Sequence, residues 1–105
     1  MGEKESKFQS DLIKELKEIF PGCEVMKQDS GYVQGVPDLV IFYGPHWAML
    51  ECKRKRGSKK QSNQDWYVDR FNDMSFARFI NPQNKKEVLY DLQQAFGIKG
   101  KARAD

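Results

Sequence analysis

Two acids and a lysine stand where the surrounding pattern predicts strands, at a spacing that could support metal-dependent chemistry. Asp38 comes directly before the apolar run 39–43, and Glu51 and Lys53 lie two residues apart near the end of the next strand-like segment. A carboxylate at the mouth of a buried strand costs free energy unless a cation or a hydrogen-bond donor pairs with it. Strand residues two apart share a face, so Glu51 and Lys53 point the same way.

The turn between these two strands decides which residues face Asp38. A turn centred on residues 45–46 pairs Asp38 with Lys53, whereas a turn centred on residues 44–45 pairs Asp38 with Glu51. We expect the first turn, because residue 45 is proline and proline suits the first central position. Either register leaves the two acids and the lysine on one face, and a slip of one residue would separate them.

A divalent cation would resolve the charge problem that the two acids create. Neighbouring carboxylates repel each other, and a metal ion between Asp38 and Glu51 removes that repulsion. Oxygen ligands without histidine or thiolate favour Mg²⁺ or Mn²⁺. Lys53 would then stand beside the metal and hold a water molecule or a phosphate oxygen. The alternative is a structural salt-bridge cluster, in which Lys53 neutralises one acid where the strand emerges into solvent.

Two further polar residues fall on the apolar stripes of predicted helices. Glu5 lies three residues before Phe8, and Gln64 lies three residues before Tyr67, each in the first turn of its helix. Residues three apart share a helix face, so both polar side chains fall on the face that should pack against the sheet. The alternative is that helix ends are exposed and that Glu5 only complements the helix macrodipole.

The hydrophobic pattern predicts seven elements that would position these residues. In chain order they are a helix over about 5–20, strands over 24–28, 38–43 and 47–55, a helix starting near Ser62 with Asp65 at capping-box spacing, a strand over 76–80 and a helix over about 84–96. Helices before and after a strand meander indicate an α/β fold with a mixed sheet flanked by helices. We expect a single domain over 1–97 and a basic, flexible tail over 98–105.

Composition favours an intracellular, globular protein. The 105 residues are 39% hydrophobic and 31% charged, and no apolar run approaches the roughly 20 residues of a membrane span. The polar residues 1–5 show no signal peptide, so we expect a cytoplasmic protein with Cys23 and Cys52 reduced. Neither cysteine has metal-binding spacing, and with His46 as the one histidine a structural zinc site is not expected.

A basic run continues directly out of the acidic cluster. The stretch "KRKRGSKK" begins at Lys53 and places six cations in eight positions, in a chain of net charge +3. On charge alone a solvated loop would explain it, but basic charge beside a metal site favours a phosphodiester substrate. We expect contacts with backbone phosphates, which carry little sequence information, from Arg54, Lys55, Arg56, Lys59 and Lys60.

The polar residues together form a two-part motif, Pro37-Asp38 followed by Glu51-Cys52-Lys53, with the two acids 13 positions apart. This motif resembles that of the PD-(D/E)xK nuclease superfamily, although it is short and weakly specific alone. The stretches "ESKFQSDLIKEL", "GVPDLV", "LECK" and "SNQDWYVDRF" are similar, in order, to the successive blocks of the VRR-NUC family and its Holliday-junction-resolvase relatives. The resemblance covers about residues 5–80.

The resemblance implies a restriction-endonuclease-like αβββαβ core, here followed by a C-terminal helix. It implies a DNA endonuclease that uses Mg²⁺ or Mn²⁺ and selects branched DNA or junctions rather than sequence. Related junction-cutting enzymes act as symmetric dimers, so we expect a homodimer on DNA and no membrane partner. The implied catalytic residues are Glu5, Asp38, Glu51, Lys53 and Gln64, and the implied metal ligands are Asp38, Glu51, the backbone carbonyl of Cys52, and Glu5.

Other assignments stay open beside this one. Asp11 or Glu15 could replace Glu5 as the acid of the first helix, although Asp11 lies off the stripe and Glu15 lies deeper in the helix. The glycine that often follows the second helix in the family is absent, and residues 73–75 stand there instead. Two weaker polar candidates lie near the predicted site: Gln9 and Gln61.

Two other functions compete with nuclease activity. A module of the same fold could clamp nucleic acid without cutting it, although the intact acids and lysine argue against that. A phage or plasmid protein could instead act on another protein through an aromatic surface, for which the candidates are Trp47, Trp66 and Tyr67.

Overall fold

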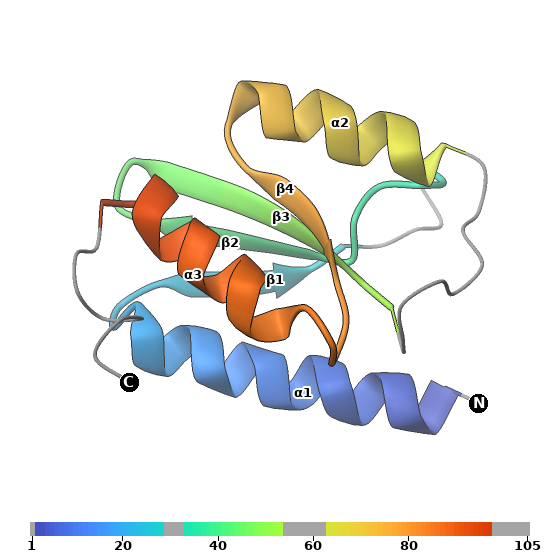
Figure 1. The fold of residues 1–105 in the computed structure, drawn as a ribbon, viewed down its shortest axis with the longest axis horizontal. Helices are drawn as coiled ribbons and strands as arrows, with labels where there is room; N and C mark the ends of the chain where they lie inside the picture. Colours follow the sequence, from blue (N-terminus) through green and yellow to red (C-terminus); the bar gives the residue numbers. More distant parts are fainter. Residues whose placement is uncertain (1, 29–32, 54–62, 98–105) are drawn as a thin grey trace.

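The computed structural model describes residues 2–28, 33–53 and 63–97, except for the side chains of residues 2–6. Within these ranges the chain forms three α-helices and one four-stranded sheet, in the expected order αβββαβα (Figure 1). None of the described helices is long and apolar enough to cross a membrane. The elements are α1 (Gly2–Ile19), β1 (Glu24–Lys27), β2 (Leu39–Tyr43), β3 (His46–Cys52), α2 (Gln64–Met74), β4 (Ala77–Ile80) and α3 (Lys85–Ala95).

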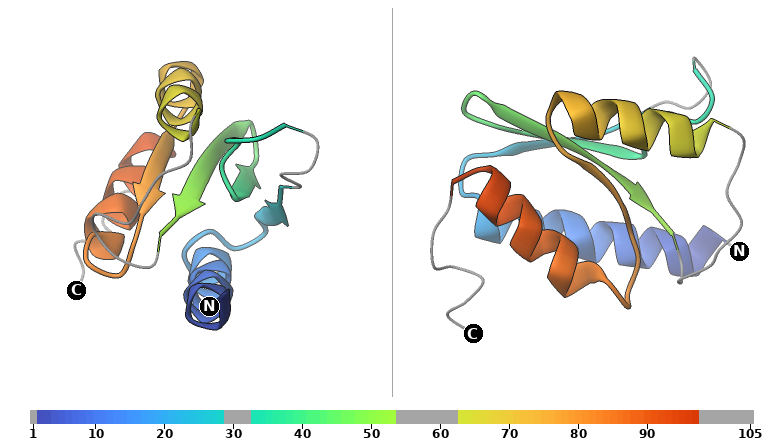
Figure 2. Two further views of the ribbon diagram at one scale, coloured as in Figure 1. Left: turned by 90° about the vertical axis from the view of Figure 1, so that its right-hand side faces the viewer. Right: turned by 45° about the horizontal axis from the view of Figure 1, so that its top comes forward.

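The sheet is mixed, with strand order β1-β2-β3-β4. β1, β2 and β3 pair antiparallel, and β4 pairs parallel to β3. A parallel pair needs a crossover connection, and α2 provides it. Figure 2 shows α2 over one face of the sheet and α1 and α3 over the other. The expected α/β class and mixed sheet are therefore confirmed.

The main core lies between the sheet and the helices α1 and α3. Leu12, Leu16 and Phe20 repeat at helical spacing along α1 and its end, and none of them is exposed to solvent. They pack against alternate strand residues such as Leu39 and Leu50. The apolar stripe read from the sequence thus faces the sheet, and it fixes which side of α1 is buried.

Neither cysteine forms a disulfide, and both are buried. Cys52 belongs to the core cluster and points away from the face that carries Glu51, as strand alternation predicts. Cys23 follows the turn after α1, and its Sγ donates to the Leu16 carbonyl at 3.8 Å. Burial raises the pKa of the Cys23 thiol, which keeps the group neutral where it packs.

The turn between β2 and β3 is centred one residue earlier than the sequence led us to expect. Tyr43 pairs with His46, so the two central residues are Gly44 and Pro45. Gly44 has a φ of 61°, and proline is restricted to a φ near −65°. Glycine with positive φ at the first central position is the pattern of a type II′ turn, whose twist matches the flanking strands. Proline at the first central position would have required a turn type that splays them.

This turn changes the residue that lies opposite Asp38. The pairing of β2 with β3 ends at Leu39 and Leu50, and one further step along both strands places Asp38 opposite Glu51. The expected pairing of Asp38 with Lys53 was therefore wrong, and the alternative register is the one the chain adopts. Lys53 lies just beyond β3, where its backbone N–H donates to the Ile80 carbonyl at 2.9 Å.

Candidate active site

The motif residues gather at one end of the sheet. Asp38 immediately precedes β2 and Lys53 immediately follows β3, and these antiparallel strands place the two positions at the same end. The start of α2 and the first turns of α1 lie on this side of the molecule as well, in both Figure 1 and Figure 2. The fold thus brings four separate segments of the chain toward one region.

Asp38 is held by hydrogen bonds to both neighbouring strands. Its Oδ2 accepts from the Cys52 N–H at 2.9 Å, and its backbone carbonyl accepts from the Gln28 N–H at 2.7 Å. The Cys52 nitrogen belongs to the peptide that follows Glu51, so the carboxylate of one acid touches the backbone of the other. A hydrogen bond from a backbone N–H to an ionised carboxylate is among the stronger ones in proteins.

Glu51, Lys53 and Gln64 form a connected cluster. Lys53 Nζ donates to Gln64 Oε1 at 2.7 Å, and Gln64 Nε2 donates to Glu51 Oε2 at 2.9 Å. Lys53 Nζ also lies 3.7 Å from Glu51 Oε2, within ion-pair distance. The sequence grouped Gln64 with these residues only through its place on a helix stripe and the resemblance, and the structure brings all three together.

Burial makes these contacts energetically important. Glu51 is 4% exposed and Gln64 is 7% exposed. A buried carboxylate is costly without donors, and the Gln64 amide can donate from its nitrogen while its oxygen accepts. Gln64 therefore links the acid Glu51 to the base Lys53. Glu51 Oε2 and Lys53 Nζ themselves lie 3.7 Å apart.

A close backbone contact sets the position of Gln64. Gly35 has a φ of 93°, and a Cβ built on it would lie 2.7 Å from the Cβ of Asn63. Asn63 precedes the first residue of α2 and has a positive φ of 80°. The loop that leads to Asp38 therefore packs directly against the start of α2, and only glycine leaves room for it.

Sequence reasoning did not single out Gly35 or Asn63. The available signal was the glycine three residues before Asp38, which a strand alone does not require. The sequence also placed the start of the second helix near Ser62. The described helix begins at Gln64 with Asn63 as its N-cap, without a capping bond from that side chain, and Ser62 lies outside the described residues.

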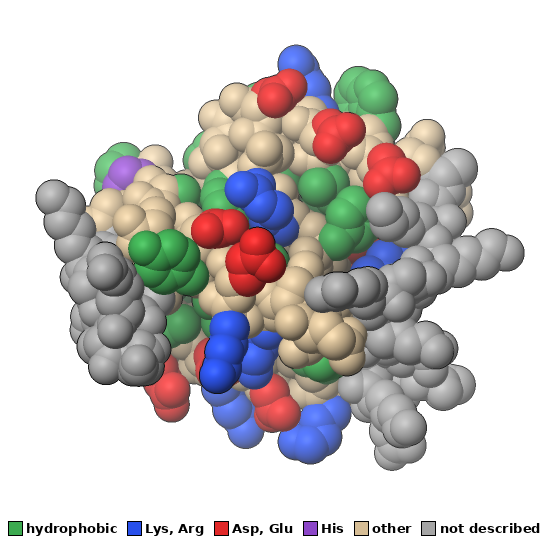
Figure 3. Space-filling view, in the orientation of Figure 1, with side chains coloured by type: hydrophobic (Ala, Val, Ile, Leu, Met, Phe, Trp, Pro, Cys, Tyr) green, Lys and Arg blue, Asp and Glu red, His purple; other side chains and the backbone are tan. Residues whose placement is uncertain are grey.

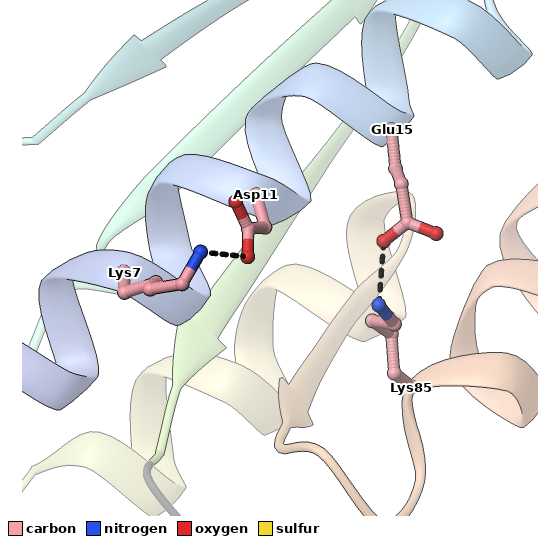
Figure 4. Close-up of polar contacts among 4 residues, drawn as sticks. All are labelled: Lys7, Asp11, Glu15 and Lys85. Carbon is pink, nitrogen blue, oxygen red and sulfur yellow. Dashed lines mark hydrogen bonds and ion pairs between the residues drawn. The ribbon is translucent and has the colours of Figure 1, made fainter.

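The alternative acids of α1 have lysine partners of their own. Asp11 Oδ2 lies 3.1 Å from Lys7 Nζ one turn away, and Glu15 Oε1 lies 2.6 Å from Lys85 Nζ at the start of α3 (Figure 4). Both pairs are partly exposed and belong to the helix surfaces rather than to the Glu51 cluster. Glu5 lies in the first turns of α1, but its side chain falls outside the described part of the structure.

Two of the described carboxylates, those of Asp38 and Glu51, are candidate ligands for a metal ion. Within residues 7–28, 33–53 and 63–97 no group of three or more histidine, cysteine, aspartate or glutamate side chains could hold a metal. Asp38 and Glu51 would supply oxygen ligands, and the other predicted ligands are Glu5 and the Cys52 carbonyl. The predicted phosphate-contacting residues lie outside the described residues, as does the tail 98–105: Arg54, Lys55, Arg56, Lys59 and Lys60.

Comparisons with protein-family models, curated proteins and solved structures find no match to this chain. The functional interpretation therefore depends on the motif and on the geometry described above.

Proposed function

We propose that this chain is a metal-dependent DNA endonuclease of the PD-(D/E)xK type, which hydrolyses phosphodiester bonds in branched DNA or junctions. The observation that carries the proposal is the Glu51–Gln64–Lys53 cluster, whose members are joined at 2.7 and 2.9 Å at the sheet end where Asp38 lies. The element order αβββαβ followed by α3 supports the same assignment, because it matches the core that the resemblance implies.

The chemistry of the donors supports a hard divalent cation. Asp38 and Glu51 offer carboxylate oxygens, and Mg²⁺ or Mn²⁺ prefers such ligands. Two described carboxylates do not complete a protein site, so we propose that Glu5 and the Cys52 carbonyl supply the rest. When bound, the ion would polarise the scissile phosphate and lower the pKa of a water molecule.

The chain's own residues would position and stabilise the reacting groups. Lys53 carries the positive charge of the cluster, so it would orient the attacking water or stabilise the negative charge that develops on the phosphate. Gln64 would hold that ammonium group at a set position relative to Glu51. The Cys52 N–H would fix the rotamer of Asp38, because it bonds one of the two carboxylate oxygens.

A structural salt-bridge cluster is the second candidate, and one observation favours it. Lys53 and Glu51 are within ion-pair distance, with side chains only 12% and 5% exposed, so they could neutralise each other without a metal. In that case the chain would be a module that binds DNA without cutting it. Activity measurements separate the two candidates.

The test is a cleavage assay on a panel of labelled DNAs. The protein is incubated with a four-way junction, a flap, a duplex and a single strand, each with Mg²⁺, with Mn²⁺ and with EDTA. We expect cutting of the branched DNAs with either metal and none with EDTA, and a dimer by light scattering. Binding without cutting under every metal condition would reject the nuclease and leave the binding module.

A further inference from the structure

A groove on the α2 side of the sheet leads toward the candidate active site. It encloses about 400 Å³ and is lined by residues 26–28 of the β1 segment and by Val40, Phe42, Trp47 and Met49. The face that α1 and α3 cover is closed by the main core, whereas α2 packs on β3 and β4. The groove therefore occupies the part of the sheet beside α2, over β1, β2 and β3.

The strand register makes the groove floor continuous with the acids. Phe42 pairs with Trp47, and Val40 pairs with Met49. Alternate residues of a strand share a face, so the next pair on this face is Asp38 with Glu51. Two residues along a strand span about 7 Å. One end of a molecule that lies in the groove would thus be two strand residues away from the two carboxylates.

Aromatic side chains of α2 flank this floor. α2 lies along β3, with Gln64 bonded to Glu51 at one end and Ser75 Oγ bonded to the Trp47 carbonyl at the other. Between these ends the rings of Tyr67 and Phe71 stack with centroids 5.7 Å apart. Phe71 meets Trp47 edge to face at 6.2 Å. Trp47, which lines the groove, therefore adjoins the aromatic rings of α2.

Apolar side chains in the groove are exposed to solvent. Phe42 is 44% exposed and Met26 is 54% exposed, and both side chains line the hollow. Lys27 and Gln28 also line the hollow, although the pairing of Lys27 with Leu39 directs its side chain toward the face that carries the main core. A cation that does share the groove's face is Lys53, which lies beside Glu51 at the end of the groove. Aromatic rings beside a cation bind single-stranded nucleic acid, since bases stack on the rings and the cation meets the phosphates.

We propose that this groove binds unstacked bases of a single DNA strand whose backbone continues to Asp38 and Glu51. The substrate would then carry unpaired nucleotides beside the bond that is cut. The part played by the two acids rests on the nuclease function proposed above, whereas base binding in the groove can be measured without it. A second copy of the chain fits less well, because a two-fold interface needs a self-complementary patch and this surface is concave.

Fluorescence of single-tryptophan variants tests the location. The chain has two tryptophans, so Trp66→Phe leaves Trp47 in the groove, and Trp47→Phe leaves Trp66, which does not line it. A 10-nucleotide single strand is titrated into each variant in EDTA, where no cleavage occurs. We expect saturable quenching of Trp47 and little change of Trp66. Equal quenching of both, or none of either, would overturn the proposal.

Affinity measurements with matched variants test the energetics. Phe42→Ala should weaken binding of the same oligonucleotide by about tenfold or more, the loss typical of one stacking ring. Met26→Ala should weaken it less, and this variant decides the matter if Phe42→Ala does not fold. Met74→Ala is the control, because Met74 is 57% exposed and lies outside the groove.

The outcomes separate the groove from the nuclease. The groove proposal is overturned if Phe42→Ala and Met74→Ala bind the oligonucleotide with equal affinity. It is also overturned if Phe42→Ala changes only the molecular mass measured by light scattering, because the surface would then mediate contacts between copies of the chain. Groove binding without cleavage in Mg²⁺ would reject only the nuclease. If Phe42→Ala cleaves duplex DNA and binds the single strand as the wild type does, only the groove proposal is rejected.

Discussion

Gln64 is a neutral side chain that sets the relative positions of the acid Glu51 and the base Lys53. Its nitrogen donates to Glu51 and its oxygen accepts from Lys53. Lys53 Nζ and Glu51 Oε2 already lie 3.7 Å apart, within ion-pair distance, and without the amide the two side chains could approach each other more closely. The amide therefore sets a geometry that simple attraction between Glu51 and Lys53 would not maintain.

Replacing Gln64 with alanine should lower both activity and stability. Cleavage should fall by about 10- to 100-fold, the usual cost of losing a residue that orients a metal site. The unfolding free energy should fall by about 1–3 kcal/mol, because buried polar groups lose a partner. Urea unfolding and cleavage rates measure the two effects, with the exposed Gln94→Ala on α3 as control. Normal cleavage by a destabilised Gln64→Ala would show that the amide is only structural.

Asp38→Asn isolates the charge of the first acid. The asparagine oxygen can still accept from the Cys52 N–H, so thermal unfolding should show a loss of only about 1 kcal/mol. Cleavage should fall by more than the roughly 10- to 100-fold that an outer-shell change costs a metal site. Asp11→Asn, which removes the same charge from the Lys7 pair, should cut at the wild-type rate. Retained cleavage in Asp38→Asn would remove this residue from the site.

At the level of elements, the placement of α2 depends on the loop before β2. The close approach of Gly35 to Asn63 sets the start of the helix, and the first helical residue carries the amide that bonds Glu51. The motif loop and α2 are therefore one structural unit, although about 28 residues of chain separate their contacting positions.

Gly35→Ala should displace the start of α2, and Gly22→Ala is its control. Both glycines have φ near 90°, but only Gly35 has neighbouring atoms within 4 Å of the added Cβ. Each variant should lose roughly 1–2 kcal/mol for the left-handed backbone, and Gly35→Ala about 1–3 kcal/mol more for the clash. Thermal unfolding measures this difference. Cleavage should fall in Gly35→Ala alone, and a parallel fall in Gly22→Ala would mean that general destabilisation explains it.

α1 carries five acids, of which Glu5, Asp11 and Glu15 are the candidates for the active site, and the orientation of the helix should separate their roles. Glu5→Gln should reduce cleavage less severely than Asp38→Asn and regain part of it in Mn²⁺, which tolerates nitrogen and neutral ligands better. Glu15→Gln removes a partly exposed pair with Lys85, so it should cost less than about 1 kcal/mol and leave cleavage unchanged. Cleavage rates in both metals measure this. An inactive Glu15→Gln beside a normal Glu5→Gln would reject Glu5 as the third acid.

On the scale of the whole molecule, charge is distributed unevenly. Asp65, Asp69 and Asp73 are exposed and follow one another at four-residue spacing along α2, and acidic side chains gather over that helix at the top of Figure 3. The outer face of α2 should therefore repel a phosphate backbone. DNA would approach instead along the groove and the sheet end where the basic run begins.

Neutralising the first part of the basic run should weaken binding to every DNA sequence alike. A triple change of Arg54, Lys55 and Arg56 to glutamine should lower the slope of log affinity against log salt by up to about 0.9 for each lost duplex phosphate contact. Titrations of duplex DNA at several salt concentrations in EDTA measure it. The control removes the same charge from three exposed lysines of the helices: Lys14, Lys17 and Lys86. Equal slopes in the two triple variants would return the run to a solvated loop.

The sequence by itself determined the order of the elements and the faces that they bury. Apolar residues such as Leu12 and Leu16 repeat at the helical period, and alternation along β3 separates Glu51 from Cys52, because both periods follow from local backbone geometry. The same local information, together with the family resemblance, grouped Asp38, Glu51, Lys53 and Gln64 as candidates. This grouping did not require knowledge of any contact between distant segments.

Only the tertiary structure decided how those candidates meet. The sequence led us to expect a turn centred on residues 45–46 instead of the observed Gly44-Pro45 turn, because several turn types accept proline and the twist of the paired strands selects among them. The bonds of Gln64 and the contact of Gly35 with Asn63 join segments far apart in the chain, and no local period encodes such distances. The groove beside α2 arises in the same way, since its floor and its aromatic flank come from elements that only the folded sheet brings side by side.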